Sequence, residues 1–277
     1  MAAPSFPPRA TGTKATTGVE LLTFPTPNGQ KPAILLEELK AAYGKDYTVQ
    51  CITLPQGVQK EPWYLALNPA GKIPVLVDHD RDIVLSECST ILQYLGRTYD
   101  TNHTLTFESE KEQLKAEQWV SFSQGEISPV SSQALRYYRH LPTRQAFPTA
   151  TTHRDLCTAF SVLDSALKDR DYLAGEGRGK YSIADIACWG PVNSSIFIGV
   201  GELTRWPALE AWAARIAERE AVKKAIEVPF KREYGNAATR KMLAEGGGFA
   251  KGDEALQKAL QDALEEFPEG PRGPSGP

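Results

Sequence analysis

The sequence predicts an α+β protein in which a small mixed domain precedes an all-helical domain. Two observations carry this prediction. Over residues 19–100, short β-forming runs alternate with amphipathic stretches in the order β-α-β and then β-β-α. A polar, aperiodic linker follows at 101–107, and beyond it apolar residues recur with the helical period. A chain of 277 residues is long enough for two such domains to bury separate cores.

The mixed domain begins with the apolar run VELLTF at 19–24, which predicts a strand. TPNG at 26–29 is rich in turn formers, and Leu35 and Leu39 then begin an apolar series at helical spacing. YTVQCITL at 47–54 contains the β-branched residues that favour a strand. The chain therefore opens with a strand, a helix and a second strand.

The other half of this domain is predicted to be a hairpin followed by a helix. IPVLVD at 73–78 and IVLS at 83–86 are β-forming runs separated by the short turn HDRD. Helical spacing resumes with Cys88, Ile91 and Leu95, which share one helix face.

The helical domain is predicted to span 108–234. Apolar periodicity places helices at 108–125, around 130–141 and at 152–168.

Two further helices of this domain have recognisable starts. Ser182 and Asp185 form the S-x-x-D pattern of a capping box, with Asp in place of the usual Glu, and we assign both to helix capping. Pro207 stands where the first turn of a helix tolerates proline, and Leu209 and Trp212 continue an apolar stripe beyond it.

Both ends of the chain are predicted to be flexible. Residues 1–18 lack the apolar core of a secretory signal and are expected to form a flexible arm. The tail at 235–277 is expected to be mostly flexible because of GGG at 246–248 and a terminal run rich in Gly and Pro. Within that tail, 252–267 is a candidate helix.

Composition excludes several classes of function. The net charge of −3 provides no basic field for nucleic acid or anionic lipid, and no apolar run approaches the roughly 20 residues of a membrane span. Four scattered cysteines without a CxxC pair indicate reduced thiols and a cytoplasmic protein. Four scattered histidines predict no metal site.

Several motifs, in order, resemble those of the glutathione S-transferase superfamily, and the TPNG variant is similar to its Ure2p-like fungal and bacterial branch. The resemblance extends over roughly residues 19–230. It implies a thioredoxin-like first domain that binds glutathione and a helical second domain. The segments that carry it are PTPNG (25–29), LLEEL (35–39), LNPAGKIPVLVD (67–78), VLSECSTILQYLGRTYD (84–100), WVSFSQGEISPVSSQ (119–133), YSIADIACWGPV (181–192) and WPALEAWAARIAERE (206–220).

The resemblance implies a glutathione site at two turns of the first domain. A cis peptide bond at Ile73–Pro74, where sequence statistics alone favour trans, would leave the Ile73 backbone free to pair with the cysteinyl unit. Glu87 and Cys88 begin a helix, so its N–H groups would receive the γ-glutamyl carboxylate and Glu87 the amine. The family has Ser at the position of Cys88. A thiol is the poorer donor, and we expect weaker glutathione binding, by about 1 kcal/mol.

Three more residues complete the implied site. Gln59 and Lys72 lie where the family holds the glycyl carboxylate, although Lys72 also has the character of a surface lysine. Asn28 matches the residue that hydrogen-bonds the thiolate and is the expected catalytic residue, although Asn28-Gly29 also suits a turn or helix cap. Thr26 is a weaker candidate, and the absence of cysteine here disfavours a Cys-type mechanism.

The acceptor pocket is expected between Asn28 and the helical domain. Trp119, Phe122, Tyr137 and Tyr138 are the candidate lining residues, although aromatic residues at helical spacing are more often core.

The leading function is transfer of glutathione to an electrophilic small molecule, with C–S bond formation in fungal secondary metabolism as one setting. A glutathione-dependent peroxidase or disulfide reductase, or a non-catalytic regulatory or assembly module, remains open. The resemblance also implies a homodimer. No nucleic-acid or membrane partner is expected.

Overall fold

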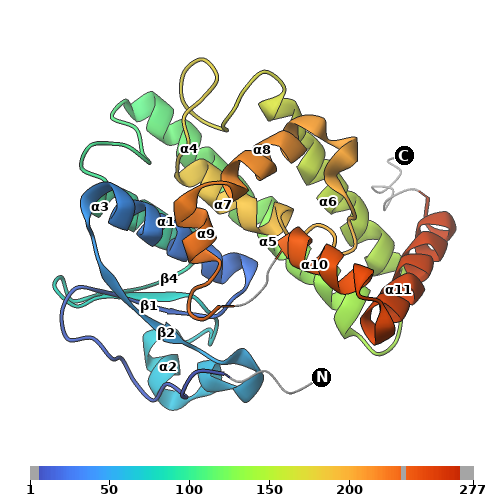
Figure 1. Ribbon diagram of the computed structural model, residues 1–277, viewed down its shortest axis with the longest axis horizontal. Helices are drawn as coiled ribbons and strands as arrows, with labels where there is room; N and C mark the ends of the chain where they lie inside the picture. The colour runs from blue at the N-terminus through green and yellow to red at the C-terminus, as the bar shows by residue number, and fades with distance from the viewer. Residues whose placement is uncertain (1–5, 232–234, 269–277) are drawn as a thin grey trace, which may run out of the picture.

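The computed structural model describes residues 6–231 and 235–268, and Figure 1 shows a sheet domain beside a larger set of helices. Residues 1–5 of the predicted arm, the end of the predicted helical domain at 232–234 and the last residues of the tail, 269–277, lie outside the described residues. No helix in the described ranges has the length and apolarity needed to cross a membrane.

The first domain has the predicted order of strands and helices. Its elements are β1 (Val19–Thr23), α1 (Pro27–Tyr43), β2 (Tyr47–Cys51), α2 (Pro62–Leu67), β3 (Val75–Asp78), β4 (Ile83–Ser86) and α3 (Cys88–Tyr99). The strand order is β2-β1-β3-β4, with β1 parallel to β2 and antiparallel to β3. This arrangement confirms the thioredoxin-like α+β fold.

Alternation along the strands places helices on both faces of the sheet. Leu21 of β1 and Leu76 of β3 join the core shared with α1 and α3. Leu22 and Val75, one residue away in each strand, face the other way and pack with Tyr64 of α2. The central strands β1 and β3 are therefore buried on both faces, and the edge strands β2 and β4 are partly exposed. Figure 1 shows helices on both sides of the sheet.

The second domain is helical, as predicted. Its elements are α4 (Glu110–Phe122), α5 (Ser128–Leu135), α6 (Ala146–Leu167), α7 (Ile183–Val192), α8 (Pro207–Ala217), α9 (Glu220–Ala225), α10 (Gly235–Ala244) and α11 (Gly247–Glu266). Two π-helical turns, Ser123–Ile127 and Arg136–His140, interrupt the run from α4 to α5 and beyond. The sequence predicts neither turn.

The centre of this domain is α7, whose start confirms the predicted capping box. The Ser182 hydroxyl accepts the Ala184 N–H, and Asp185 accepts the Ser182 N–H at 3.0 Å. Asp185 also accepts the indole N–H of Trp212 at 2.8 Å, which ties α7 to α8. The wholly buried carboxylate thus has several donors.

Polar contacts of Glu38 and Asp100 help to join the two domains. Arg219 forms a bidentate pair with Glu38 of α1, at 2.6 and 2.9 Å. Asp100 receives the backbone N–H of Leu105 and the hydroxyl of Thr106, which folds the linker around its carboxylate. The linker therefore has a defined conformation.

The ends of the chain are more ordered than the sequence predicts. Ala10 is buried, and buried Glu20 accepts the backbone N–H groups of Lys14 and Ala15, so the described part of the arm docks on the sheet domain. In the tail, α10 replaces part of the expected flexible segment, whereas α11 contains the candidate helix at 252–267, beginning earlier at Gly247 and ending at Glu266. Leu260 of α11 packs in a buried cluster with Tyr138.

The tail folds because its polar residues also find partners. Asp253 of α11 pairs with Arg139 at 2.6 Å, and both side chains are almost fully buried. Gly246, whose φ is +72°, provides the reversal between α10 and α11 that residues with a side chain rarely adopt. Gly246 therefore lies in a tight connection between the helices, and the two glycines after it begin α11.

Candidate functional site

Three adjoining cavities run along the boundary between the two domains. We call them the Glu87 cavity (about 350 Å³), the central cavity (about 360 Å³) and the outer cavity (about 430 Å³). Asn28 and Ser128 line both the Glu87 and central cavities. Thr26 and Leu135 line both the central and outer cavities, so the three form one continuous cleft.

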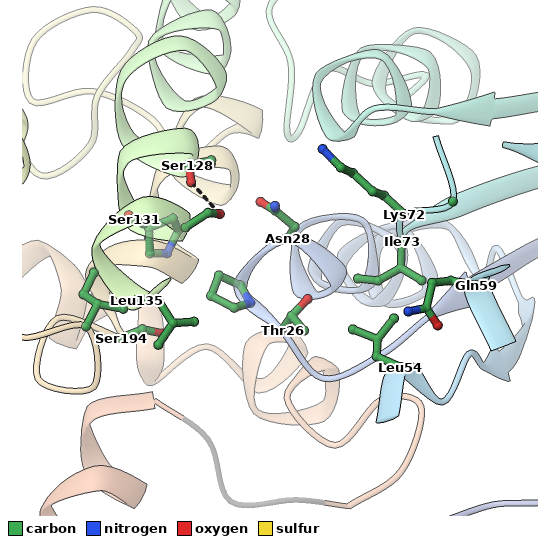
Figure 2. Close-up of a pocket in the computed structure, with 15 residues that line it drawn as sticks. Thr26, Asn28, Leu54, Gln59, Lys72, Ile73, Ser128, Ser131, Leu135 and Ser194 are labelled. Carbon is green, nitrogen blue, oxygen red and sulfur yellow. Dashed lines mark hydrogen bonds between the residues drawn. The ribbon is translucent and has the colours of Figure 1, made fainter. Parts of the chain in front are cut away.

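Figure 2 shows the central cavity between α5 and two loops of the sheet domain. Ser128, Ser131 and Leu135 project from α5 on one side. Ile73 and Gln59 lie opposite, with Asn28 between the two walls. The cleft therefore brings the predicted binding loops to face the helical domain.

Asn28 lies in the first turn of α1. Thr26 is the N-cap, since its hydroxyl accepts the Gly29 N–H at 3.0 Å, so the alternative in which Asn28 is the capping residue does not hold. The Asn28 amide oxygen is buried and has no hydrogen-bond partner among the described residues. An unpaired buried amide in a cleft is a group that a bound ligand can satisfy.

The second wall is the loop that ends in Pro74. The Ile73–Pro74 peptide bond is cis, as the resemblance implied. The carbonyl of Lys72 accepts the Tyr64 hydroxyl and the Asn68 amide, both at 2.8 Å, which fixes the loop from behind. The Lys72 side chain is exposed and lies on the cleft (Figure 2).

Gln59 reaches the same cavity from the segment before α2. Its amide oxygen is buried without a partner among the described residues. Together with the exposed ammonium of Lys72, it offers this part of the cleft both an amide and a positive charge.

The Glu87 cavity contains the start of α3. Glu87 has a φ of +68°, uncommon for a residue with a side chain, and its carboxylate is exposed on the cavity. The buried Cys88 thiol donates to the Asn28 carbonyl at 3.4 Å. Burial raises the pKa of this thiol to about 11, so it is a neutral donor near pH 7.

The chemistry of this cavity suits a zwitterion. The N-termini of α1 and α3 both border it, and their free N–H groups favour an anion. The Glu87 carboxylate at the same end favours an ammonium. All seven residues predicted for glutathione line the Glu87 or central cavity: Asn28, Gln59, Lys72, Ile73, Pro74, Glu87 and Cys88.

The structure places the four predicted acceptor-pocket residues elsewhere. Trp119 and Phe122 stack edge to face, 5.5 Å between ring centroids, against the helical core. Tyr137 and Tyr138 line a separate hollow of about 40 Å³ beside α11. Trp119 and Phe122 therefore form packing contacts, and α11 covers Tyr138.

The residues that line the acceptor side were not predicted from the sequence. On α5 they are Ser128, Ser131, Ser132 and Leu135, and their i, i+3, i+4, i+7 spacing was a usable signal. In the outer cavity they include Gly235, Ala238, Thr239 and Met242 of α10. The α10 residues were not predicted because the tail was expected to be mostly flexible.

An aromatic cluster lies behind the outer cavity. Phe24, which lines that cavity, contacts Phe6 of the N-terminal arm and Phe230 beyond α9, with ring centroids 6.1 and 5.9 Å away. The N-terminal arm and the segment between α9 and α10 therefore support this wall.

Comparison with known proteins agrees with this geometry. Residues 26–98 match the family described as glutathione S-transferase, N-terminal domain, and residues 146–220 match glutathione S-transferase, C-terminal domain. The chain is 33% identical over 215 residues to the disulfide-bond oxidoreductase YfcG of Escherichia coli, which covers 75% of this chain and 94% of that protein.

Two solved structures share the fold. A glutathione transferase homolog from Lodderomyces elongisporus, with two GSH per subunit, has a TM-score of 0.71 and 31% identity over 77% of this chain and 99% of its own. Ure2p in complex with glutathione has a TM-score of 0.71 and 25% identity, over 77% and 96%. With its two matched domains, this chain belongs to the glutathione S-transferase superfamily and to its Ure2p-like branch.

Proposed function

We propose that this protein is a glutathione S-transferase that joins the glutathione sulfur to an uncharged electrophile. The observation that carries the proposal is the position of Asn28, at the junction of a cavity suited to a zwitterion and a cleft that continues into an apolar cavity. Among the described lining residues of the outer cavity, His140 is the one titratable group. Such a cavity favours an apolar, neutral acceptor.

Each part of glutathione has a partner in the proposal. The γ-glutamyl end binds at the start of α3, with its carboxylate on the N–H groups and its amine on Glu87. The cysteinyl unit pairs with the Ile73 backbone, and Lys72 and Gln59 hold the glycyl carboxylate. The sulfur then lies beside Asn28.

The chemical step is simple. The thiol loses its proton to water, and a hydrogen bond from the Asn28 amide together with the N-terminal end of α1 stabilises the thiolate. The sulfur lone pair forms a C–S bond with the electrophilic carbon, and the displaced electron pair leaves with a leaving group or is protonated after addition. Lowering the thiol pKa by two units requires about 2.7 kcal/mol.

A direct experiment tests the proposal. The protein should be retained on glutathione-agarose, elute with free glutathione and conjugate a general aryl halide in a spectrophotometric assay. Untargeted metabolite profiling with and without the protein would then identify the natural adduct. Binding without turnover over a broad acceptor panel would favour a non-catalytic module.

Disulfide reduction is the second candidate. Its support is the 33% identity to a relative named as a disulfide-bond oxidoreductase. Two glutathione molecules would reduce one disulfide, releasing two thiols and glutathione disulfide. Following glutathione disulfide with a coupled reductase, while offering a small disulfide in place of the aryl halide, distinguishes the two reactions.

Assembly and location are also part of the proposal. We infer a homodimer from the superfamily resemblance, and light scattering on purified protein tests it. A cytoplasmic location is supported by four buried free cysteines, and fluorescence microscopy of the tagged chain tests that.

A further inference from the structure

Lys31 is a buried lysine that the proposed mechanism does not use. It lies on α1, one turn after Asn28, and is 1% exposed. Its amino group donates to the hydroxyls of Ser123 and Ser128, at 3.1 and 2.7 Å, and to the amide oxygen of Gln124, at 3.0 Å. Among the described residues, no carboxylate forms a salt bridge with it.

The three acceptors are brought together by the π-turn Ser123–Ile127, which leads directly into Ser128. The Ser123 hydroxyl donates to the Ala187 carbonyl at 2.6 Å, so a lone pair remains for Lys31. Three acceptors match the three donors of an ammonium, whereas a neutral amine has two. The arrangement therefore suits the charged form, and π-turns often occur at functional sites.

The titratable groups that act on Lys31 are two thiols, Cys88 from α3 and Cys188 from α7. Burial raises their pKa values to about 11 and about 12, so both are neutral near pH 7. Burial lowers the pKa of the Lys31 ammonium, and the two cysteines would raise it only in their thiolate forms. The nearby carboxylate of Glu87 adds to the raised pKa of Cys88, and that of Asp185 adds to the raised pKa of Cys188.

This charge lies directly behind the wall of the cleft. Two of its acceptors, Gln124 and Ser128, line the Glu87 cavity, and Ser128 also lines the central cavity. A buried charge without a counter-ion is costly and favours any anion that reaches its surroundings. The anion formed in the proposed reaction is the thiolate beside Asn28.

We propose that Lys31 is a positioning residue whose buried, uncompensated charge favours the thiolate form of glutathione bound beside Asn28. The inference rests on the proposed function, since it requires glutathione in the cleft. The alternative is a purely structural role, in which Lys31 only links α1 to the π-turn before α5. If Lys31 favours the thiolate, removing its charge raises the pKa of the bound thiol. If its role is purely structural, removing it weakens glutathione and S-methylglutathione alike.

The experiment compares wild type with Lys31→Met and Gln124→Glu. The first variant removes the charge, and the second keeps Lys31 but supplies a counter-charge of nearly the same shape as Gln124. The bound thiol is titrated by its thiolate ultraviolet absorbance without any acceptor. Calorimetry gives the affinities of glutathione and S-methylglutathione, which has no titratable thiol.

We expect both variants to raise the pKa of the bound thiol by about one unit or more. S-methylglutathione affinity should stay within about threefold, the scale of one weak neutral contact. An unchanged thiol pKa in Gln124→Glu, or an equal loss of both ligands in Lys31→Met, overturns the proposal. Should Lys31→Met not fold, the Gln124→Glu titration decides alone.

The controls separate this inference from the proposed function. Lys40→Met removes a charge from an exposed position of the same helix that pairs with Asp46 and lines none of the three cavities, and its bound thiol should titrate like that of wild type. Wild type that does not bind glutathione refutes both proposals. If wild type binds glutathione with a lowered thiol pKa and both variants titrate like wild type, only the role of Lys31 is refuted.

Discussion

Asn236 holds α10 in place, and its removal should open the acceptor side of the cleft. Its side-chain oxygen accepts the Ile196 N–H at 3.0 Å, and its amide donates to the Ser195 hydroxyl at 2.9 Å. Its own N–H donates to the Asn193 carbonyl at 2.6 Å. The side chain is 5% exposed, so these bonds have little competition from water.

The cost of Asn236→Ala follows from these contacts. The Ile196 N–H loses its acceptor in a buried place, which costs about 1–3 kcal/mol, and the bond to Ser195 adds about 1 kcal/mol. We therefore expect the free energy of unfolding to fall by about 2–4 kcal/mol. Urea denaturation measures this loss as a lower midpoint at unchanged slope.

The kinetic consequence should be confined to the acceptor. α10 contributes Ala238, Thr239 and Met242 to the outer cavity, whereas described residues of α10 and α11 line neither the central nor the Glu87 cavity. We expect the KM for a bulky apolar acceptor to rise about tenfold, while the KM for glutathione changes less than about twofold. An equal rise in both constants would refute the assignment of α10 to the acceptor side.

Arg240→Ala is the matched control. Arg240 lies on the same helix, and its ion pair with Glu202 is about half exposed on both sides. Exposed pairs contribute about 0–1 kcal/mol, so this variant should unfold nearly like wild type and keep its acceptor KM.

Three further predictions concern the site and its support. Asn28→Ala should lower kcat/KM by about 10- to 100-fold near pH 7, with partial recovery at pH 9, because a hydrogen bond to a charged group contributes about 1.5–3 kcal/mol; a pH-rate profile parallel to wild type contradicts this. Glu87→Ala should weaken glutathione binding by about 10- to 100-fold, whereas Cys88→Ser should change it less than about threefold or improve it; calorimetry measures both, and equal losses refute our account of this end. Burial raises the pKa of Asp185 from 3.8 to about 6. The native state then holds this proton more tightly than the unfolded chain, so wild-type stability should fall by about 2 kcal/mol as pH rises from 4 to 6. The urea midpoint of Asp185→Asn should not show this fall in stability with rising pH. A fall parallel to that of wild type would contradict the prediction.

The order of elements was predictable because local patterns determine it. Alternating β-type and helical stretches gave the first domain, and the Ser182–Asp185 pattern located the start of α7. The helix expected from 152 instead begins at Ala146, since Pro148 is tolerated in a first turn. Each of these features depends on neighbours in the sequence.

The acceptor side depends on contacts that the sequence does not reveal. The π-turn at Ser123–Ile127 brings Ser123, Gln124 and Ser128 to the same lysine, 92 or more residues earlier in the chain. Such a turn changes which side chains face the cleft, and helical periodicity cannot signal it. The order of the tail likewise depends on Asp253 finding Arg139 across 114 residues.

The Phe6–Phe24–Phe230 cluster has a practical consequence for anyone who purifies this protein. An affinity tag fused at the amino end sits five residues before Phe6, whose ring supports the wall of the outer cavity through Phe24. Acceptor preferences measured with and without such a fusion therefore test whether this cluster supports the outer cavity, and glutathione affinity is the control because Phe6 lines neither the Glu87 nor the central cavity. Cleaving the tag before any substrate screen removes this variable.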